Sequence, residues 1–267
     1  MRKTASQVIE AMEINKENLE FLPTGFRLID EELDGGFLRK ELVVLGGKTG
    51  IGKSIVAGQI MWNLSQKGFN TAYFSLEIAS EMVVARLLGS LSKIKPTRIM
   101  AGLLTVEEFQ RKIQAKADFL VRDKFMYFYD DVYLLDQIIA EIKTNQYEFV
   151  VVDFIQNIFV PGSGDEYSRL SLVALKLQKL AKEANCCILV LSQLSNTVAR
   201  EGQKNPNVEY KGSGSIATVC DLGFFIERRE GVDQTQNPIT INLRKNRRGR
   251  SGIAWEYTYH SPGGEIV

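Results

Sequence analysis

The hydrophobic positions of this chain fall into short continuous runs, separated by longer stretches with helical periodicity. The runs are rich in valine, isoleucine, leucine and aromatic residues and predict strands at 41–46, 70–75, 125–130, 149–154 and 187–192. The periodic stretches predict helices at 53–67, 78–92, 105–119, 133–145 and 168–185. Because the strand runs are apolar throughout, they require burial on both faces. Their alternation with helices predicts βαβ units and an α/β fold with a mostly parallel central sheet.

The last third of the chain has a different pattern. Strands are predicted near 221–227, 238–247 and 253–259 with little helix between them, as an antiparallel extension on one edge of the sheet. Polar, glycine-containing stretches at 158–169 and 195–215 predict exposed loops. Each loop follows the carboxyl end of a predicted parallel strand, which is where the ligand loops of open α/β sheets lie.

The N-terminal segment predicts a short amphipathic helix over 5–13. The apolar residues on one side of it are Val8, Ile9, Met12 and Ile14. This helix packs either on its own domain or on a neighbouring subunit, and the sequence favours neither. We therefore divide the chain into a linker-like helical segment at 1–18 and one domain at 19–267.

Composition excludes several classes of protein. The 267 residues are 45% hydrophobic and 24% charged, with 33 Lys and Arg against 32 Asp and Glu, so any nucleic-acid binding requires local basic patches. The odd set Cys186, Cys187 and Cys220 implies no disulfide framework and indicates the reducing cytoplasm. The single histidine, His260, argues against a histidine-based metal site. No run reaches the length of a membrane span, so no membrane partner is expected.

The strongest local motif is GKTGIGKS, which lies between the predicted strand ELVVLG and the helix IVAGQIMWNL. It matches G-x-x-x-x-G-K-[ST] in the required strand–loop–helix context. Glycines let the backbone wrap around a phosphate at the helix N-terminus, Lys53 brings a positive charge to the β- and γ-phosphates, and the Ser54 hydroxyl suits Mg²⁺. The whole cradle comprises Gly47, Lys48, Thr49, Gly50, Ile51, Gly52, Lys53 and Ser54.

Three polar residues end other apolar strands. Asp153 ends FVVVDF, where a carboxylate can hold Mg²⁺ through water. Glu77 ends YFSLE, where a carboxylate could deprotonate the water that attacks a γ-phosphate or could simply favour the dipole of a starting helix. Gln193 ends VLSQ with a neutral amide suited to sensing a γ-phosphate.

The stretch LRKNRRGRSG at 243–252 concentrates cations in a nearly neutral chain. Side chains two positions apart on a strand point the same way, so Lys245 and Arg247 are expected to continue the apolar face of the preceding run ITINL. Two cations there suit a phosphate held by another molecule. A solvated surface hairpin is the alternative, and it accounts better for the other cations, namely Arg244, Arg248 and Arg250.

Taken in order, these motifs resemble the ATPase domain of DnaB-type replicative helicases. The matching segments are LPTGFRLIDEELDGGFLRKELVVLGG, GKTGIGKS, YFSLEIASEMVVARLL with Arg86, VVVDFIQNI, LSQLS, KGSGSIATVCD and LRKNRRGRSG. The P-loop alone is common to many ATPases, whereas this ordered set is much more specific. The resemblance implies a RecA-like P-loop NTPase fold with antiparallel edge strands near the C-terminus.

The resemblance also implies roles. Glu77 would be the catalytic base, Asp153 the Mg²⁺-organising acid and Gln193 the γ-phosphate sensor, while Lys53, Ser54 and Arg86 would bind ATP and Mg²⁺. Lys245 and Arg247 would be fingers that reach the ATP of a neighbouring subunit, with arginine typically contributing about 10³–10⁵ in rate.

Single-stranded DNA would pass through the centre of a ring, expected to be a hexamer, gripped by loops from each subunit. The resemblance places Lys211, Gly212 and Gly214 in such a loop. The further DNA-binding candidates in these loops are Arg169, Arg200 and Lys204. Six copies around one strand would multiply their modest charge, which reconciles DNA binding with a net charge of +1.

The sequence departs from the family pattern at several positions. Gly212 replaces an acidic residue, Gly50 and Ile51 replace a Ser-Met pair, and Arg248 and Arg250 replace Asn and Pro. Only residues 1–21 precede the first matching motif, so the N-terminal collar domain of cellular replicative helicases has no counterpart in this sequence. That indicates a collarless relative or an excised domain. Primase and loader proteins, the partners that the resemblance implies, would dock partly on the collar.

The leading hypothesis is therefore an ATP-driven helicase motor that moves on single-stranded DNA. A RadA-like recombination ATPase is the second hypothesis, because GIGKS and KNRRG look somewhat similar to motifs of that family. The third is a nucleotide-dependent assembly or loading ATPase that forms oligomers without unwinding DNA. Unwinding separates the first from the third, and strand exchange or branch migration identifies the second.

Overall fold

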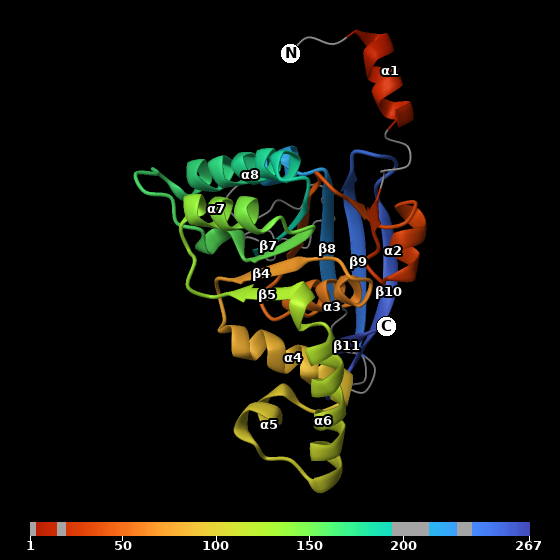
Figure 1. Ribbon diagram of the computed structural model, residues 1–267. Helices are drawn as coiled ribbons and strands as arrows, with labels where there is room; N and C mark the ends of the chain where they lie inside the picture. The colour runs from red at the N-terminus through yellow and green to blue at the C-terminus, as the bar shows by residue number, and fades with distance from the viewer. Residues whose placement is uncertain (1–3, 15–19, 194–213, 229–236) are drawn as a thin grey trace.

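A twisted sheet flanked by helices forms the centre of the protein (Figure 1). The computed structural model describes residues 4–14, 20–193, 214–228 and 237–267. Within them the strand order of the large sheet is β11-β10-β9-β8-β3-β7-β6-β4-β5. Its strands are β3 (Leu42–Gly47), β4 (Thr71–Ser75), β5 (Met126–Tyr129), β6 (Phe149–Asp153), β7 (Cys187–Gln193), β8 (Leu222–Arg228), β9 (Asn237–Asn246), β10 (Ile253–His260) and β11 (Glu265–Ile266). A small antiparallel pair, β1 (Phe21–Leu22) and β2 (Phe37–Leu38), lies outside this sheet.

The helices follow the predicted alternation with the strands. They are α1 (Ala5–Ile14), α2 (Arg27–Glu32), α3 (Lys53–Gln66), α4 (Ser80–Ser92), α5 (Pro96–Ala101), α6 (Val106–Val121), α7 (Leu135–Asn145), α8 (Glu166–Glu183) and α9 (Gly214–Val219). The helices expected at 53–67, 78–92, 105–119, 133–145 and 168–185 are confirmed as α3, α4, α6, α7 and α8, with small shifts at their ends. The short helices α2, α5 and α9 were not predicted.

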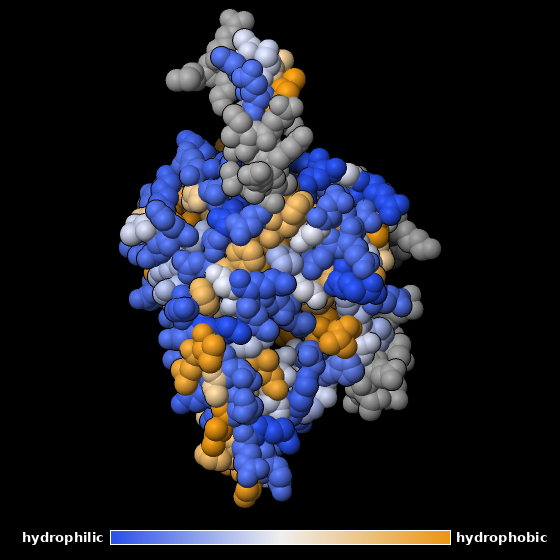
Figure 2. All heavy atoms as spheres, turned by 45° about the vertical axis from the view of Figure 1, so that its right-hand side comes forward, coloured by the Kyte–Doolittle hydropathy of each residue, from blue (hydrophilic) through white to orange (hydrophobic). Residues whose placement is uncertain are grey.

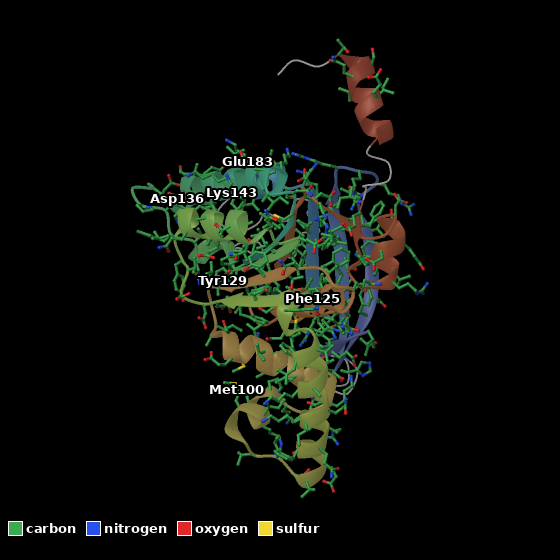
Figure 3. The ribbon with its side chains drawn as sticks, viewed as in Figure 1. Met100, Phe125, Tyr129, Asp136, Lys143 and Glu183 are labelled. Atoms are coloured by element: carbon green, nitrogen blue, oxygen red, sulfur yellow. The ribbon has the colours of Figure 1, made fainter. Side chains whose placement is uncertain are left out.

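Burial on both faces of the sheet explains the continuous apolar strands. On β3, Val43 and Leu45 join the cluster under α3 and α4, whereas Leu42 and Val44 join the cluster under α7, α8 and α9. Helices α7 and α8 lie side by side over the second cluster, and the ion pair Lys143–Glu183 joins them at 2.8 Å (Figure 3). A mostly parallel sheet with helices on both faces is therefore confirmed.

The antiparallel extension is confirmed for β9 and β10. The strand predicted near 221–227 is confirmed as β8, but its predicted direction is wrong. Strand β8 pairs in parallel with β3, and the antiparallel part of the sheet begins with the pairing of β8 and β9. A parallel crossover usually contains a helix, and α9 lies directly before β8. The sequence analysis had assigned its first residues to the loop at 195–215. Six residues are too few to show helical periodicity, so this crossover was not recognised.

The predicted face of Lys245 is also wrong. A bulge in the β8–β9 pairing places Leu243 opposite Phe224 but Lys245 opposite Gly223, so that Arg244 is an extra residue. Residues directly opposite each other share a face of the sheet. Leu243 therefore faces the α3 side with Phe224, whereas Lys245 faces α9.

Two apolar surfaces are exposed at opposite ends of the molecule. Helix α1 stands apart from the sheet in Figure 1, and its Val8 and Ile9 side chains are 43% and 55% exposed. At the other end, apolar side chains gather over α5 and α6 (Figure 2). These exposed residues are Met100, Leu103, Val106, Phe109 and Ile113. No helix among the described residues is long and apolar enough to cross a membrane.

Candidate nucleotide-binding site

A glycine-containing loop connects the carboxyl end of β3 to the start of α3. Gly52 precedes α3 with a φ of 117°, a backbone conformation that side chains other than glycine rarely adopt. The ammonium of the buried Lys53 lies inside the loop, where it donates to the carbonyl oxygens of Gly47 at 2.9 Å and Lys48 at 3.0 Å. The loop therefore curls around a positive charge at a helix N-terminus, which is the arrangement that binds phosphate.

Asp153 lies behind the loop at the end of β6 and is only 1% exposed. Burial raises the pKa of its carboxyl group, whereas hydrogen bonds from Tyr73 and Ser54 and the charges of Lys53 and Arg86 lower it. The Tyr73 hydroxyl donates to Asp153 Oδ2 at 2.6 Å. Sequence analysis missed Tyr73, although a tyrosine inside an apolar strand generally needs a hydrogen-bond partner.

The loop opens into a cleft of about 390 Å³ that brings most of the predicted site together. Its walls include eight predicted residues, namely Thr49, Gly50, Gly52, Lys53, Ser54, Glu77, Arg86 and Gln193. Burial raises the pKa of Glu77, the charge of Asp153 raises it further, and Lys53 and Arg86 oppose both effects. Burial lowers the pKa of the Lys53 ammonium, whereas the negative charges of Asp153 and Glu77 raise it. A carboxylate more basic than usual thus faces a phosphate cradle.

The C-terminal segment forms a wall of the cleft that the sequence analysis did not identify. Its contributions are Tyr259, Gly263 and Gly264. Gln59 of α3 holds this segment by exchanging hydrogen bonds of 2.7 and 3.1 Å with the backbone of Ile266. These contacts join residues that are far apart in the chain, so no local sequence pattern predicts them.

Arg228 also lies beside the cradle, at the end of β8. Its guanidinium carbon is 4.6 Å from the centre of the Tyr259 ring. A Cβ atom added to Gly52 would be 3.9 Å from an Arg228 nitrogen, so this stacked pair borders the phosphate loop. A cation against an aromatic ring at the rim of a phosphate site offers a flat surface to a base.

Lys245 and Arg247 lie at the opposite edge of the sheet from the cradle. The backbone N–H of Arg247 donates to Asp221 O, and that of Asp221 donates to Leu42 O, so Arg247 is level with the first residue of β3. The cradle begins at Gly47, the last residue of β3, roughly 17 Å further along at about 3.3 Å per residue. These two cations are therefore placed away from the cradle of their own chain.

The other cations of the hairpin contact acidic residues of their own chain. Arg248 pairs with Glu41 at 3.0 Å, and Arg250 pairs with Glu32 at 3.2 Å. Arg244 lies 3.8 Å from Glu227. Arg250 is 77% exposed, as expected for a solvated hairpin. Arg248 is not, because it is only 23% exposed and also donates to the carbonyl oxygens of Leu33 and Gly36.

The predicted DNA-binding residues are only partly visible. Gly214 is the first residue of α9, and the guanidinium of Arg169 donates to the carbonyl oxygens of Gln156 and Ile158. The remaining candidates lie outside the described residues, namely Arg200, Lys204, Lys211 and Gly212. Their role stays a prediction.

The residues present fit a magnesium ion. Mg²⁺ prefers oxygen ligands and commonly takes one or two protein side chains together with phosphate oxygens and water. The Ser54 hydroxyl lies near enough to the Asp153 carboxylate to lower its pKa, and together the two side chains are such a donor set beside the cradle.

The cradle, the buried aspartate and the strand order define a P-loop nucleotide-binding domain. The chain belongs to the DnaB-like helicase C terminal domain family, whose family model matches residues 22–261. It is 28% identical to the replicative DNA helicase DnaB of Treponema pallidum (strain Nichols), over 91% of this chain and 55% of that protein. It is 27% identical to the replicative DNA helicase DnaC of Bacillus subtilis (strain 168), over 91% of this chain and 56% of that protein. The chain spans about half the length of the curated relatives it matches.

Solved structures confirm the fold class. One solved ATPase domain aligns with a TM-score of 0.88 at 18% identity, covering 100% of this chain and 99% of that one. A DnaB-like replicative helicase, described with its interactions with primase, aligns with a TM-score of 0.86 at 20% identity, covering 100% of this chain and 68% of that one. At these identities the likeness concerns the RecA-like fold alone. The family match does not favour the RadA-like alternative.

Proposed function

We propose that this chain is the ATP-hydrolysing motor of a ring-forming DNA helicase that translocates on single-stranded DNA. The observation that carries the proposal is the division of the candidate catalytic groups between two edges of one sheet. Lys53, Glu77 and Gln193 line the cleft, whereas Lys245 and Arg247 lie at the far edge. A complete site then needs the cleft of one subunit and the far edge of the next.

Each group in the cleft has a role that follows from its position. Lys53 and the loop amides bind the β- and γ-phosphates, and the Arg228–Tyr259 pair stacks on the base. Asp153 and Ser54 would hold Mg²⁺, which when bound would neutralise charge on the phosphate oxygens. Glu77 accepts a proton from the attacking water, and Gln193 senses the γ-phosphate.

The concentration dependence of hydrolysis tests the proposal. We expect the ATPase rate to rise more steeply than linearly with protein concentration, because a shared site exists only in the oligomer, and we expect single-stranded DNA to stimulate it. The measurement is steady-state ATP hydrolysis with and without DNA, together with unwinding of a forked duplex. A linear rate over a range where the oligomer dissociates, indifferent to DNA, would favour a non-motor ATPase. Hydrolysis without unwinding would favour the assembly or loading alternative.

We also propose that the segment 1–18 docks on a neighbouring subunit. Its Val8 and Ile9 side chains are exposed, and α6 presents Phe109 and Ile113 to solvent at the other end of the molecule. Apolar side chains on two separate surfaces of one chain can pair between copies and close a ring.

Charged substitutions on this apolar surface are expected to weaken assembly. Phe109→Glu should raise the protein concentration at which oligomers form by about tenfold or more, since burying an unpaired charge costs more than about 1.4 kcal/mol. Sedimentation velocity measures the effect, with Lys112→Glu on the same helix as the control. Unchanged assembly of Phe109→Glu would show that this surface is not where subunits meet.

We further propose that the protein binds a primase and that it is located in the cytoplasm. The primase partner is supported by the likeness to a DnaB-like replicative helicase described with its interactions with primase. The cytoplasm is supported by three buried free cysteines, Cys186, Cys187 and Cys220.

A further inference from the structure

Asp221 lies at the junction between α9 and β8, and both oxygens of its carboxylate are engaged. Oδ2 accepts a hydrogen bond of 2.9 Å from the backbone N–H of Leu42, the first residue of β3. Oδ1 accepts one of 3.0 Å from the guanidinium of Arg247 and a longer one of 3.4 Å from Gln178 of α8. One side chain thus connects the start of β3, helix α8 and the β9–β10 hairpin.

A second contact fixes the same guanidinium. The carbonyl oxygen of Thr218, near the end of α9, accepts from Arg247 at 2.9 Å and from the Lys245 ammonium at 2.7 Å. A planar guanidinium held at two of its nitrogens has a defined orientation. Asp221 is largely buried, with 15% of its side chain exposed, whereas Arg247 is 47% exposed. The carboxylate is thus anchored in the domain while the arginine it holds faces outward.

We propose that Asp221 is the positioning residue for the Arg247 finger. Its carboxylate orients the guanidinium toward the nucleotide of the neighbouring subunit and ties it to β3, the strand that ends in the subunit's own phosphate cradle. This inference rests on the proposed function, in which Arg247 acts in trans. Arg244 and Arg250 differ from Arg247, because the carboxylates with which they pair, Glu227 and Glu32, form no side-chain hydrogen bond to β3 among the described residues.

Asp221→Asn is expected to lower kcat by roughly 10- to 100-fold, a fraction of the roughly 10³–10⁵ that an arginine finger supplies. KM for ATP should stay within about twofold, because a finger acts on the transition state and the cleft is untouched. Glu227→Gln, which removes the carboxylate beside Arg244, is the matched control and should leave both constants unchanged. A rise in KM with unchanged kcat would place the effect of Asp221 in its own cleft and overturn the proposal.

Mixed oligomers show whether Asp221→Asn lowers activity through Arg247 or through β3 and the phosphate cradle of its own chain. Mixing Asp221→Asn with Lys53→Ala should restore activity, because the first protein brings an intact cradle and the second an intact finger. Mixing Asp221→Asn with Arg247→Ala should restore nothing, because neither brings a working finger. The opposite pattern would mean that Asp221 acts through β3 on its own cradle and would overturn the proposal.

A third mixture separates this inference from the function on which it rests. Lys53→Ala with Arg247→Ala should regain activity if fingers act in trans, and labelled subunits verify exchange in every mixture. Failure of this mixture would refute the shared site, and the role of Asp221 with it. The role of Asp221 alone would be refuted if the Lys53→Ala and Arg247→Ala mixture regains activity while Asp221→Asn is rescued by Arg247→Ala and not by Lys53→Ala. If Asp221→Asn does not fold, Asp221→Ser, whose hydroxyl can still accept from Leu42, enters the same mixtures.

Discussion

Mixing two inactive variants, Lys53→Ala and Arg247→Ala, is expected to restore ATP hydrolysis that neither shows alone. Lys53 lies inside the phosphate loop, whereas Arg247 is level with Leu42 at the opposite edge of the sheet. Lost transition-state charge stabilisation should lower kcat of Arg247→Ala by about 10³–10⁵. In a mixed ring, an intact cradle meets an intact finger at some interfaces. Steady-state hydrolysis across mixing ratios measures the recovery.

Arg250→Ala is the matched control for this experiment. It removes an arginine from the same hairpin, one that is 77% exposed, pairs with Glu32 and has no proposed role in hydrolysis. We expect its hydrolysis rate to be unchanged within about twofold, since exposed ion pairs contribute little. The shared site is refuted if Lys53→Ala and Arg247→Ala demonstrably exchange subunits and the mixtures remain inactive.

Glu77→Gln is expected to lower kcat by about 10²–10⁴ while nucleotide affinity remains close to that of the parent protein. The amide keeps the shape of the side chain but cannot take a proton from water. Glu81→Gln, on the first turn of the adjacent helix α4, is the matched control and should hydrolyse ATP normally. Single-turnover hydrolysis and binding of a fluorescent nucleotide separate the two effects. Normal turnover by Glu77→Gln would assign the base elsewhere.

The pH dependence of turnover gives a second readout for Glu77. A general base works only when deprotonated, so kcat should fall as the pH falls through the pKa of Glu77. That pKa lies above its ordinary value of 4.5, because burial and the charge of Asp153 raise it. Arg86 opposes this rise, so Arg86→Ala should move the acid limb to higher pH. An acid limb that does not move would argue that the rate is limited by a group whose pKa Arg86 does not influence.

Much of the fold followed from local patterns. Continuous apolar runs such as FVVVDF predicted doubly buried strands, and β6 is buried along its whole length. The crossover before β8 was missed because α9 is one short helix, and it changed the predicted direction of that strand. The bulge opposite Gly223 could not be foreseen, since a bulge depends on the pairing partner and not on the strand itself.

Some residues of the candidate site can be predicted from local sequence, whereas others reach the site only through the fold. The cradle residues are consecutive in the chain, so their spacing alone predicted Lys53 inside a loop. The partners Tyr73, Arg228 and Tyr259 come from three separate strands and meet the cradle only after folding. Asp221 lies in the segment KGSGSIATVCD, 26 residues before Arg247, and no local pattern connects the two residues.

The class of fold, the phosphate cradle and the polar residues that end the parallel strands can be predicted from the amino-acid sequence, because they depend on periodicity and on contacts between near neighbours. The direction of β8, the face of Lys245 and the C-terminal wall of the cleft become known only from the folded structure. The same holds for the position of Arg247 at the opposite edge of the sheet from the cradle. Those features depend on which strands pair and in which register, and pairing is set by the burial of side chains contributed by distant parts of the chain.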